Sequence, residues 1–340
     1  MRLNFCTLFD NNYLLQGLAL HQSLCKHAPS FNLFILCFDE ESKKNLQKLS
    51  LESVTIITLA EFEDEELLKV KPTRTRAEYC WTCSASIIRY CIKKFNLDHC
   101  TYVDADVFFL KDPAALYQEM GDKEVAITSH NYDPVYDRSV SSGEFCIQYV
   151  TFFNKHKAMA LLEQWRTQCI EWCYARHEEG KFGDQMYLDP WPSYDFVHVI
   201  KQKGAGMAPW NVNQFKPKAE SYLFRAEEPA DLVFYHFHGL KVYRDLSFVY
   251  TLDYYLPGWV KVAVYETYCK ILSKQWENLT RTRDIVFPEL KVFPEKSSLI
   301  RTQFLKIKSN IFILAIIMFT KNKHKLRFDP YLFKSIHYIR

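Results

Sequence analysis

Apolar runs and helical periodicities alternate along the first third of the chain. Runs typical of buried strands occur at 3–9, 32–38, 54–59 and 100–110. Amphipathic segments that predict helices lie between them, at about 10–27, 39–49 and 76–95, with an acidic connector at 61–68. Strands and helices that alternate in this way form parallel pairs with right-handed crossovers, so the pattern predicts an α/β sheet.

The remaining pattern predicts more strands separated by longer loops. Strand-like runs occur at 124–128, 145–153, 197–200 and 232–238, and helices are predicted at 112–120, 155–178 and 259–276. The helix at 155–178 places Leu161, Leu162 and Trp165 on one face, which we interpret as core. Residues 129–143 are polar and rich in turn formers, which is typical of a loop over a site.

Charge is distributed unevenly between the body and the end of the chain. Residues 296–340 contain ten Lys or Arg and one acidic residue, although the formal net charge of the whole chain is only +3. We expect a catalytic domain at 1–285 and a basic, amphipathic, helical extension at 286–340. The extension is interpreted either as an anchor on an anionic membrane surface or as a helical subdomain docked on the body. Because the body is acidic, nucleic acid is not an expected partner.

The eleven cysteines show no compact disulfide framework. Their spread favours reduced thiols, and the chain enters a strand-like run directly, without signal-peptide architecture. We therefore expect a cytoplasmic protein, peripheral on the inner face of the cytoplasmic membrane through its basic extension. The single CxxC at 80–83 lies in a predicted helix, without the second pair typical of a zinc site.

Two aspartates interrupt an otherwise apolar strand, in the stretch CTYVDADVFFL. Asp104 and Asp106 are two residues apart, so in a strand both project from one face. Burying two carboxylates together is costly unless a cation lies between them, and Mg²⁺ or Mn²⁺ prefers such oxygen ligands. Ligands also bind at the carboxyl ends of strands in open α/β sheets. In the alternative interpretation, the pair caps the next turn and faces water.

Three further stretches carry candidate chemistry. YHFHGL places His236 and His238 at the end of an apolar strand, and an imidazole beside carboxylates favours Mn²⁺ over Mg²⁺. The alternative is one core and one surface histidine. FGDQMYLDPW exposes Asp184 and Gln185 at a helix start, unless Asp184 is a plain N-cap. In GAGMAPWN, at 204–211, the glycines allow close approach of the backbone to a ligand.

Five motifs occur in the order found in the retaining GT-A glycosyltransferases of family 8, the type that includes glycogenin and lipopolysaccharide galactosyltransferases. The chain resembles that family from about residue 3 to 241, through FDNNYLLQG, SIIRY, YVDADV, GDQMYLD and HFHG. The resemblance implies a GT-A nucleotide-diphospho-sugar transferase fold, a Rossmann-like mixed sheet flanked by helices.

The resemblance also assigns roles to individual residues. Metal ligands would be Asp104, Asp106 and His236, and Asp184 with Gln185 would lie at the reacting sugar. The donor nucleotide would contact Asp10, Asn12, Tyr13, Arg89, Asp104 and Lys241. An acceptor or sugar pocket would include Gln148, Trp210, Asn211 and His238.

The sequence differs from the family pattern in two places. The Phe-Asn-Ala-Gly strand of the family is Phe-Cys-Ile-Gln at 145–148, which changes the groups facing the sugars. The Gly-x-x-Lys-Pro-Trp that follows the histidine is replaced by Gly-Leu-Lys-Val-Tyr at 239–243. The chain is thus similar to a divergent member.

The resemblance predicts a hexosyltransferase that uses Mn²⁺ or Mg²⁺ to move a sugar from a UDP-sugar to a glycan or lipid-linked acceptor. We expect retention of configuration and a role in cell-surface polysaccharide or lipopolysaccharide synthesis. A sugar nucleotidyltransferase is an alternative, although it would usually need a glycine-rich basic loop where Phe-Asp-Asn-Asn stands at 9–12. A non-catalytic protein that binds nucleotide sugars on the same fold is another.

Overall fold

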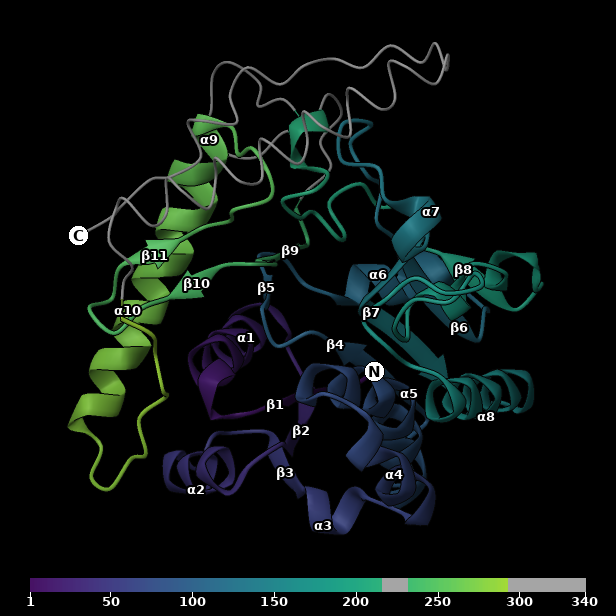
Figure 1. Cartoon of the computed structure of the whole chain (residues 1–340), viewed down its shortest axis with the longest axis horizontal. Coiled ribbons are helices and arrows are strands. Elements are labelled where there is room, and N and C mark those ends of the chain that lie inside the picture. The colour runs from purple at the N-terminus through teal and green to yellow at the C-terminus, as the bar shows by residue number, and fades with distance from the viewer. Residues whose placement is uncertain (216–231, 293–340) are drawn as a thin grey trace.

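A seven-stranded mixed sheet with helices on both faces forms the body of the protein, as the computed structural model shows (Figure 1). The structure describes residues 1–215 and 232–292. The strand order is β3-β2-β1-β4-β7-β6-β8. This arrangement confirms the predicted α/β fold class.

The first four strands of the sheet are parallel, as predicted. They are β1 (Leu3–Phe9), β2 (Phe31–Cys37), β3 (Val54–Thr58) and β4 (His99–Val103), connected through α1 (Leu14–His27), α2 (Glu40–Leu49) and α5 (Arg76–Lys94). Side chains cap two of these helices: Asp39 accepts from the Ser42 amide at α2, and Thr75 forms a capping box with Glu78 at α5.

The acidic connector predicted at 61–68 is instead mostly helical. It contains α3 (Leu59–Phe62) and α4 (Glu65–Val70), followed by the 3₁₀ turn η2 (Lys71–Thr73). The carboxylates that suggested a loop are used at helix starts: Asp64 accepts from the Leu67 amide, and Glu61 completes a capping box with Thr58. Acidic residues in a first turn also complement the helix dipole, which explains the difference.

The other half of the sheet is mixed. β7 (Phe145–Phe153) runs antiparallel to β4 and to β6 (Val125–Ser129), and β8 (Val197–Val199) pairs with β6 in parallel. The helices of this half are α6 (Ala114–Met120), the short α7 (Ser139–Ser142) and α8 (His156–Glu171). α8 is shorter than predicted because the backbone becomes extended at Trp172. Leu161, Leu162 and Trp165 are buried, as expected.

The strand predicted at 100–110 is broken at the two aspartates. β4 ends at Val103, a turn follows, and β5 (Val107–Phe109) leaves the main sheet to pair antiparallel with β9 (Phe234–His236). The segment at 232–238 therefore lies outside the main sheet. The β5–β9 register pairs Val107 with His236 and so brings the histidine beside the aspartates.

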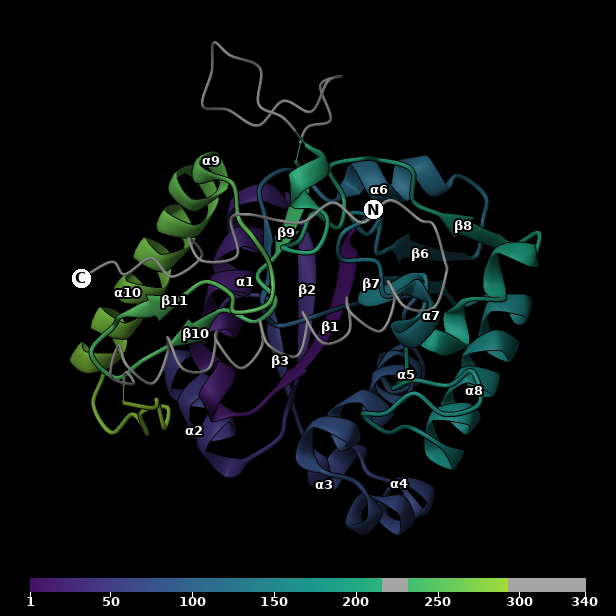
Figure 2. The same cartoon turned by 45° about the horizontal axis from the view of Figure 1, so that its top comes forward.

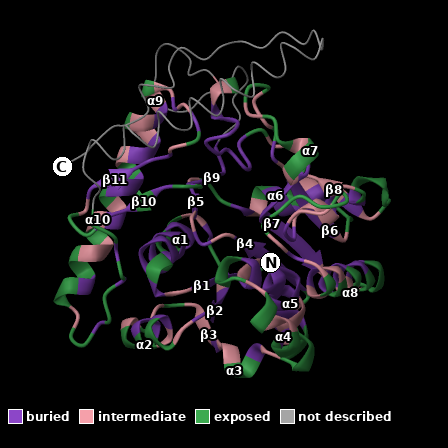
Figure 3. Ribbon diagram, in the orientation of Figure 1, coloured by how far each residue is buried: buried purple, intermediate pink, exposed green. Residues whose placement is uncertain are grey.

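Two hydrophobic clusters cover the two faces of the sheet. One contains residues of α1 and of α10 (Glu266–Arg281), and the other contains residues of α5 and α8. Figure 2 shows these helix pairs on opposite sides of β1 and β2, and in Figure 3 the strands between them are largely buried. α10 is preceded by α9 (Gly258–Val260) and the π turn η6 (Lys261–Tyr265).

Short elements complete the described chain. They are the 3₁₀ turns η1 (Asn11–Tyr13), η3 (Met186–Leu188), η4 (Trp191–Ser193) and η5 (Val212–Gln214), and the two-stranded pair β10 (Lys241–Val242) and β11 (Phe248–Val249). Within the described ranges, no helix is both long and apolar enough to span a bilayer. Most of the predicted basic extension, 293–340, lies outside the described residues.

Candidate active site

Asp104, Asp106 and His236 converge where β4 ends. His236 Nε2 lies 3.1 Å from Asp106 Oδ1 and 3.7 Å from Asp104 Oδ2, and one ligand atom from each residue falls within 4.8 Å of the others. The main-chain amide of Phe237 donates to the Asp106 carbonyl at 2.9 Å, which fixes the turn against β9. The two carboxylates thus face one point although the strand between them is broken.

The pKa values of Asp104, Asp106 and His236 depend strongly on one another. Burial raises the pKa of Asp104 to about 6. Burial acts in the same direction on Asp106, but the charge and hydrogen bond of His236 outweigh it and lower its pKa. Burial alone would lower the pKa of His236; the two carboxylates, chiefly Asp106, raise it well above its usual value. The two carboxylates thus favour positive charge between them, and when no metal ion is bound the protonated His236 ring supplies it.

The chemistry of the donor set fits a divalent cation. Two carboxylates supply the hard oxygen ligands that Mg²⁺ and Mn²⁺ prefer, and the imidazole adds a ligand that Mn²⁺ accepts more readily. Binding a divalent cation would release the His236 proton and offset the repulsion between the carboxylates. The three residues could therefore hold the predicted metal ion.

Gln148 orients the histidine. Its Oε1 accepts from His236 Nδ1 at 2.9 Å, which leaves Nε2 directed at the carboxylates. Gln148 is fully buried behind the histidine and is not among the residues that line the cavity, so the structure does not bring it to the predicted sugar pocket. Gly206 packs against it: a Cβ there would lie 2.6 Å from Gln148 Nε2, and φ is +80°. This glycine permits close approach to a side chain of the protein, whereas the sequence suggested a ligand.

A cavity of about 700 Å³ opens beside the metal ligands. Of the predicted site residues, nine line it: Asp10, Tyr13, Asp104, Asp106, Asp184, Gln185, Trp210, His236 and His238. The charge of Asp106, followed by burial, raises the pKa of Tyr13, so its phenol stays protonated. Tyr102, which the sequence did not single out, donates from its hydroxyl to Asp104 Oδ1 at 3.1 Å.

Asp184 and Gln185 enter the cavity from an irregular segment. Burial, opposed by a hydrogen bond from Ser84 and supported by the charge of Asp104, raises the pKa of Asp184 to about 7. Gln185 occupies the N-cap position of η3 without a capping hydrogen bond, and its Nε2 donates to the Ser142 carbonyl. Asp184 is thus not the N-cap of the alternative interpretation, because it lies one residue earlier and is buried at the cavity.

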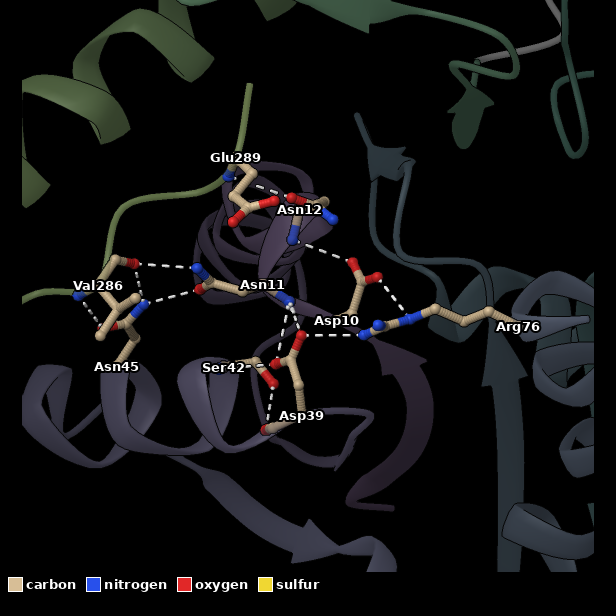
Figure 4. A network of polar contacts seen from close by, with 9 residues as sticks. All are labelled: Asp10, Asn11, Asn12, Asp39, Ser42, Asn45, Arg76, Val286 and Glu289. Carbon is tan, nitrogen blue, oxygen red and sulfur yellow. Dashed lines mark hydrogen bonds and ion pairs between the residues drawn. The ribbon is translucent and has the colours of Figure 1, made fainter. Parts of the chain in front are cut away.

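The far end of the cavity carries a charged network that the sequence analysis missed (Figure 4). Arg76 donates from Nε to Asp10 at 2.9 Å and from Nη2 to Asp39 at 3.0 Å. Although burial acts to raise the pKa of Asp39, hydrogen bonds and the Arg76 charge lower it. Arg76 lines the cavity beside Asp10, held in place by two carboxylates. An arginine at a predicted helix start was the available signal.

A C-terminal segment crosses the start of α1 next to this network (Figure 4). Asn45 donates to the Val286 carbonyl at 2.7 Å and accepts from the Val286 amide at 2.9 Å, and Asn11 also donates to that carbonyl. Asn12 accepts from the Glu289 amide at 3.1 Å and does not line the cavity. In the structure, the side chain of Asn12 is therefore engaged by this segment.

Three other predicted residues are not brought to the cavity. Arg89 points to α8 and pairs with Glu163 at 2.6 Å, because its position on α5 faces away from Arg76. Lys241 is exposed on β10. Asn211 is buried and donates to the carbonyls of His130 and Gly206, so it fixes a loop. These positions do not support the predicted contacts with ligand.

Aromatic rings beside His238 form another part of the cavity wall. This aromatic wall consists of His130, Tyr132, Trp210 and Tyr254, all of which line the cavity. Only Trp210 was singled out from the sequence. The polar loop predicted at 129–143 contributes His130 and Tyr132, so the interpretation of that loop as cover over a site is consistent with its position.

More than half of the chain matches the model of one protein family. The model of glycosyl transferase family 8 matches residues 4–177, a range that includes most of β1, the aspartate pair and β7. The chain belongs to glycosyltransferase family 8. It is therefore a glycosyltransferase, as the motifs predicted.

Two proteins of Bacillus subtilis, both uncharacterized, are similar to this chain over most of its length. The chain is 33% identical to the uncharacterized protein YfnD of Bacillus subtilis over 254 residues, 72% of this chain and 80% of YfnD. It is 31% identical to YfnF of the same organism over 248 residues, 70% of this chain and 82% of YfnF.

One solved structure supports the GT-A fold. The galactosyltransferase LgtC, in complex with donor and acceptor sugar analogs, superposes with a TM-score of 0.51 at 11% identity, covering 81% of this chain and 99% of LgtC. At that identity the likeness concerns the fold alone.

Proposed function

We propose that this glycosyltransferase moves a hexose from a UDP-sugar to a glycan or lipid-linked acceptor, with a divalent metal ion held by Asp104, Asp106 and His236. The observation that supports this most is the convergence of these three side chains in the wall of a cavity that also contains Asp10, a residue assigned to the nucleotide by the family resemblance. We assign the nucleotide to the end with Asp10, Tyr13 and Arg76, and call it the nucleotide end.

The proposed chemistry follows from the groups around the cavity. Asp104, Asp106 and His236 would hold a divalent cation, which would supply positive charge beside the diphosphate leaving group as the glycosidic bond breaks. The acceptor oxygen bonds to the anomeric carbon, the bond from that carbon to the diphosphate oxygen breaks, and the hydroxyl proton passes to the departing diphosphate. Ionised Asp184 would stabilise the positive charge that develops on the sugar ring.

The other groups hold this arrangement in place. Tyr102 donates to Asp104 and Gln148 accepts from His236, so each of these ligands has a second, fixing contact. Gln185 connects the segment that carries Asp184 to the loop that ends at Ser142. Retention of the anomeric configuration is part of the proposal and rests on the family resemblance.

We also propose a role in cell-surface polysaccharide or lipopolysaccharide synthesis, with the basic extension bound to anionic lipid on the inner face of the cytoplasmic membrane. The ten Lys or Arg at 296–340 support the membrane contact. Removing residues 297–340 should shift the enzyme from membranes to the supernatant at low salt. Unchanged partitioning of the truncated and full-length chains would contradict this.

The function is tested by incubating the full chain with Mn²⁺ and each of UDP-glucose, UDP-galactose and their N-acetyl derivatives. We expect one of them to release UDP, release to stop with EDTA, and Asp106→Ala to abolish it. Release by none of these donors, or equal release by the variant, would contradict the proposal. Tight binding of a UDP-sugar without any turnover would also contradict it.

A further inference from the structure

The aromatic wall offers flat apolar surface for a sugar ring. His130 stacks on Tyr132 with centroids 4.6 Å apart and an angle of 10°, and Trp210 meets His130 edge-on at 5.3 Å. Tyr254 lies 6.3 Å from Trp210. Sites for small ligands combine such apolar walls with a few fixed polar groups. The polar groups of this wall therefore indicate which ligand it takes.

His130 provides one such polar group. The residue is only 4% exposed and lines the cavity, and its buried Nδ1 has no hydrogen-bond partner among the described residues. Burial lowers the pKa of His130 to about 3, so the ring is neutral. A buried polar atom without a partner is costly, so a small rotation of the ring that lets a ligand hydroxyl reach Nδ1 would be favourable.

Arg138 provides the charge. It is exposed, lines the same cavity, and its guanidinium lies over the Tyr254 ring at 5.8 Å. None of the ion pairs between residues of 1–215 and 232–292 includes it, whereas Arg76, the other arginine of the lining, is paired with Asp10 and Asp39. An arginine fork matches a carboxylate or a phosphate in shape and charge.

The position of this charge relative to the metal ligands separates it from the nucleotide end. The ring of His238 lies between the two regions: its centroid is 5.7 Å from that of His236 and 6.4 Å from that of Tyr254. A diphosphate on the metal would lie at His236, with its nucleoside toward Asp10. Arg138 therefore stands on the side of the cavity from which the second substrate would approach.

We propose that His130, Tyr132, Trp210, Tyr254 and Arg138 bind an acceptor sugar that carries an anionic group, a carboxylate or a phosphate, with Arg138 as the residue that selects the anion. This inference rests on the proposed function, because it takes the nucleotide end as the place of the donor. Arg138 determines specificity and is not a catalytic residue.

The test compares matched ligands on the full chain saturated with UDP and Mn²⁺. Isothermal titration calorimetry would measure the dissociation constants of methyl glucoside, its C6 carboxylate (methyl glucuronide) and its 6-phosphate. The galactose series would be measured in the same way. We expect the wild type to bind an anionic glycoside at least about 10-fold more tightly than its neutral partner. In Arg138→Gln, the ratio of the dissociation constants of the neutral and the anionic glycoside should fall to about 2 or less. The control variant Arg281→Gln changes an exposed arginine away from the cavity and should leave this ratio unchanged.

A second variant distinguishes the contribution of the aromatic wall from that of the Arg138 charge. Tyr132→Ala should weaken neutral and anionic glycosides by the same factor and keep their ratio. Equal binding of neutral and anionic glycosides by the wild type, or an unchanged ratio in Arg138→Gln, would overturn the proposal. Weaker binding of UDP, with glycosides unaffected in Arg138→Gln, would also overturn it by assigning Arg138 to the donor diphosphate.

UDP is titrated first, in the absence of glycosides, so that the two proposals fail in different ways. Failure of UDP and Mn²⁺ to bind would contradict the proposed function. Normal UDP binding without preference for an anionic glycoside would contradict only the inference about Arg138.

Discussion

The two ends of the cavity are built differently. At the nucleotide end, charged side chains are paired with one another, and Asp10, Asp39 and Arg76 form a closed network at the first turns of helices. At the aromatic wall, rings stack on rings, and Arg138 stands over Tyr254 without a carboxylate partner in the described parts of the chain. At the nucleotide end, the side chains are already held in place by one another, which suits a ligand of constant structure. At the aromatic wall, the charge of Arg138 is available to pair with an anionic group of the ligand.

The backbone explains this difference. The nucleotide end lies at the carboxyl ends of parallel strands, where short βα turns fix each side chain close to a strand. The aromatic wall is assembled from loops at 130–143, 204–211 and 237–254 that converge from distant parts of the chain. Changes at the nucleotide end should therefore alter use of the donor, and changes at the wall should alter choice of acceptor.

Outside the metal ligands, the largest effect of a single change is expected at Asp184, which lines the cavity. Asp184→Asn keeps the shape but removes the charge opposite the reacting sugar, so kcat should fall by about 100-fold or more. Steady-state kinetics with both substrates would measure this, and we expect the KM of the UDP-sugar to change by less than about threefold. A kcat within a few-fold of wild type would remove Asp184 from the chemistry.

The same residue sets the expected pH dependence. Burial raises the pKa of Asp184 to about 7, and the proposed role needs the ionised carboxylate. Activity should therefore be low at pH 5, rise through about pH 7 and level off above it. The rise should disappear in Asp184→Asn, whose side chain does not titrate. A profile of kcat against pH that is the same in the wild type and the variant would contradict this assignment.

Gln148 should affect the metal without touching either substrate. Gln148→Leu removes the acceptor for His236 Nδ1, and loss of such a contact typically weakens a metal site by about 10- to 100-fold. The Mn²⁺ concentration for half-maximal activity should rise by that factor. Saturating Mn²⁺ should restore kcat. Loss of kcat that excess Mn²⁺ does not restore would mean that Gln148 does more than orient the histidine.

Arg76 and Arg89 offer a matched pair on one helix. Arg76→Ala removes the cation at the nucleotide end and leaves Asp10 and Asp39 unpaired, so the KM of the UDP-sugar should rise by about 10-fold. Arg89→Ala should leave that KM unchanged, because Arg89 pairs with Glu163 outside the cavity. The reverse order of effects would restore the prediction made from the sequence and contradict the positions found here.

The smallest effect concerns stability at the nucleotide end. Asn45 is fully buried and exchanges hydrogen bonds with both main-chain groups of Val286, so Asn45→Ala should lower the free energy of unfolding by about 2 kcal/mol. Asn12→Ala removes one exposed contact with Glu289 and should cost less than about 0.5 kcal/mol. Urea unfolding of the wild type and the two variants would measure these free energies. Equal losses in both variants would show that Asn45 does not hold the segment at Val286 in place.

The parallel half of the fold and the convergence of Asp104, Asp106 and His236 were both expected from the sequence. Strands, helix caps and the aspartate pair are local patterns, and the family resemblance supplied His236 from more than a hundred residues away. Arg89 and Lys241 do not line the cavity, and a motif could not show this because it fixes neither the rotation of a helix nor the path of a loop. The break between Asp104 and Asp106 also escaped prediction, since each flanking segment reads as strand.

The aromatic wall could not be predicted because no local pattern connects its parts. His130, Trp210 and Tyr254 come from three separate loops, and each reads singly as an ordinary core or surface residue. Gln148 was expected to face a sugar because it occupies a family motif position. Its direction depends on the antiparallel pairing of β7 with β4, which a single sequence does not specify.

Binding of Mn²⁺ by the full chain with UDP, followed by electron paramagnetic resonance of the free ion, tests the metal centre most directly. We expect the wild type to bind one Mn²⁺, with UDP increasing its affinity, and the double variant Asp104→Asn, Asp106→Asn to bind none at the same concentrations. A double variant that binds Mn²⁺ as the wild type does would place the metal elsewhere and contradict the site described here.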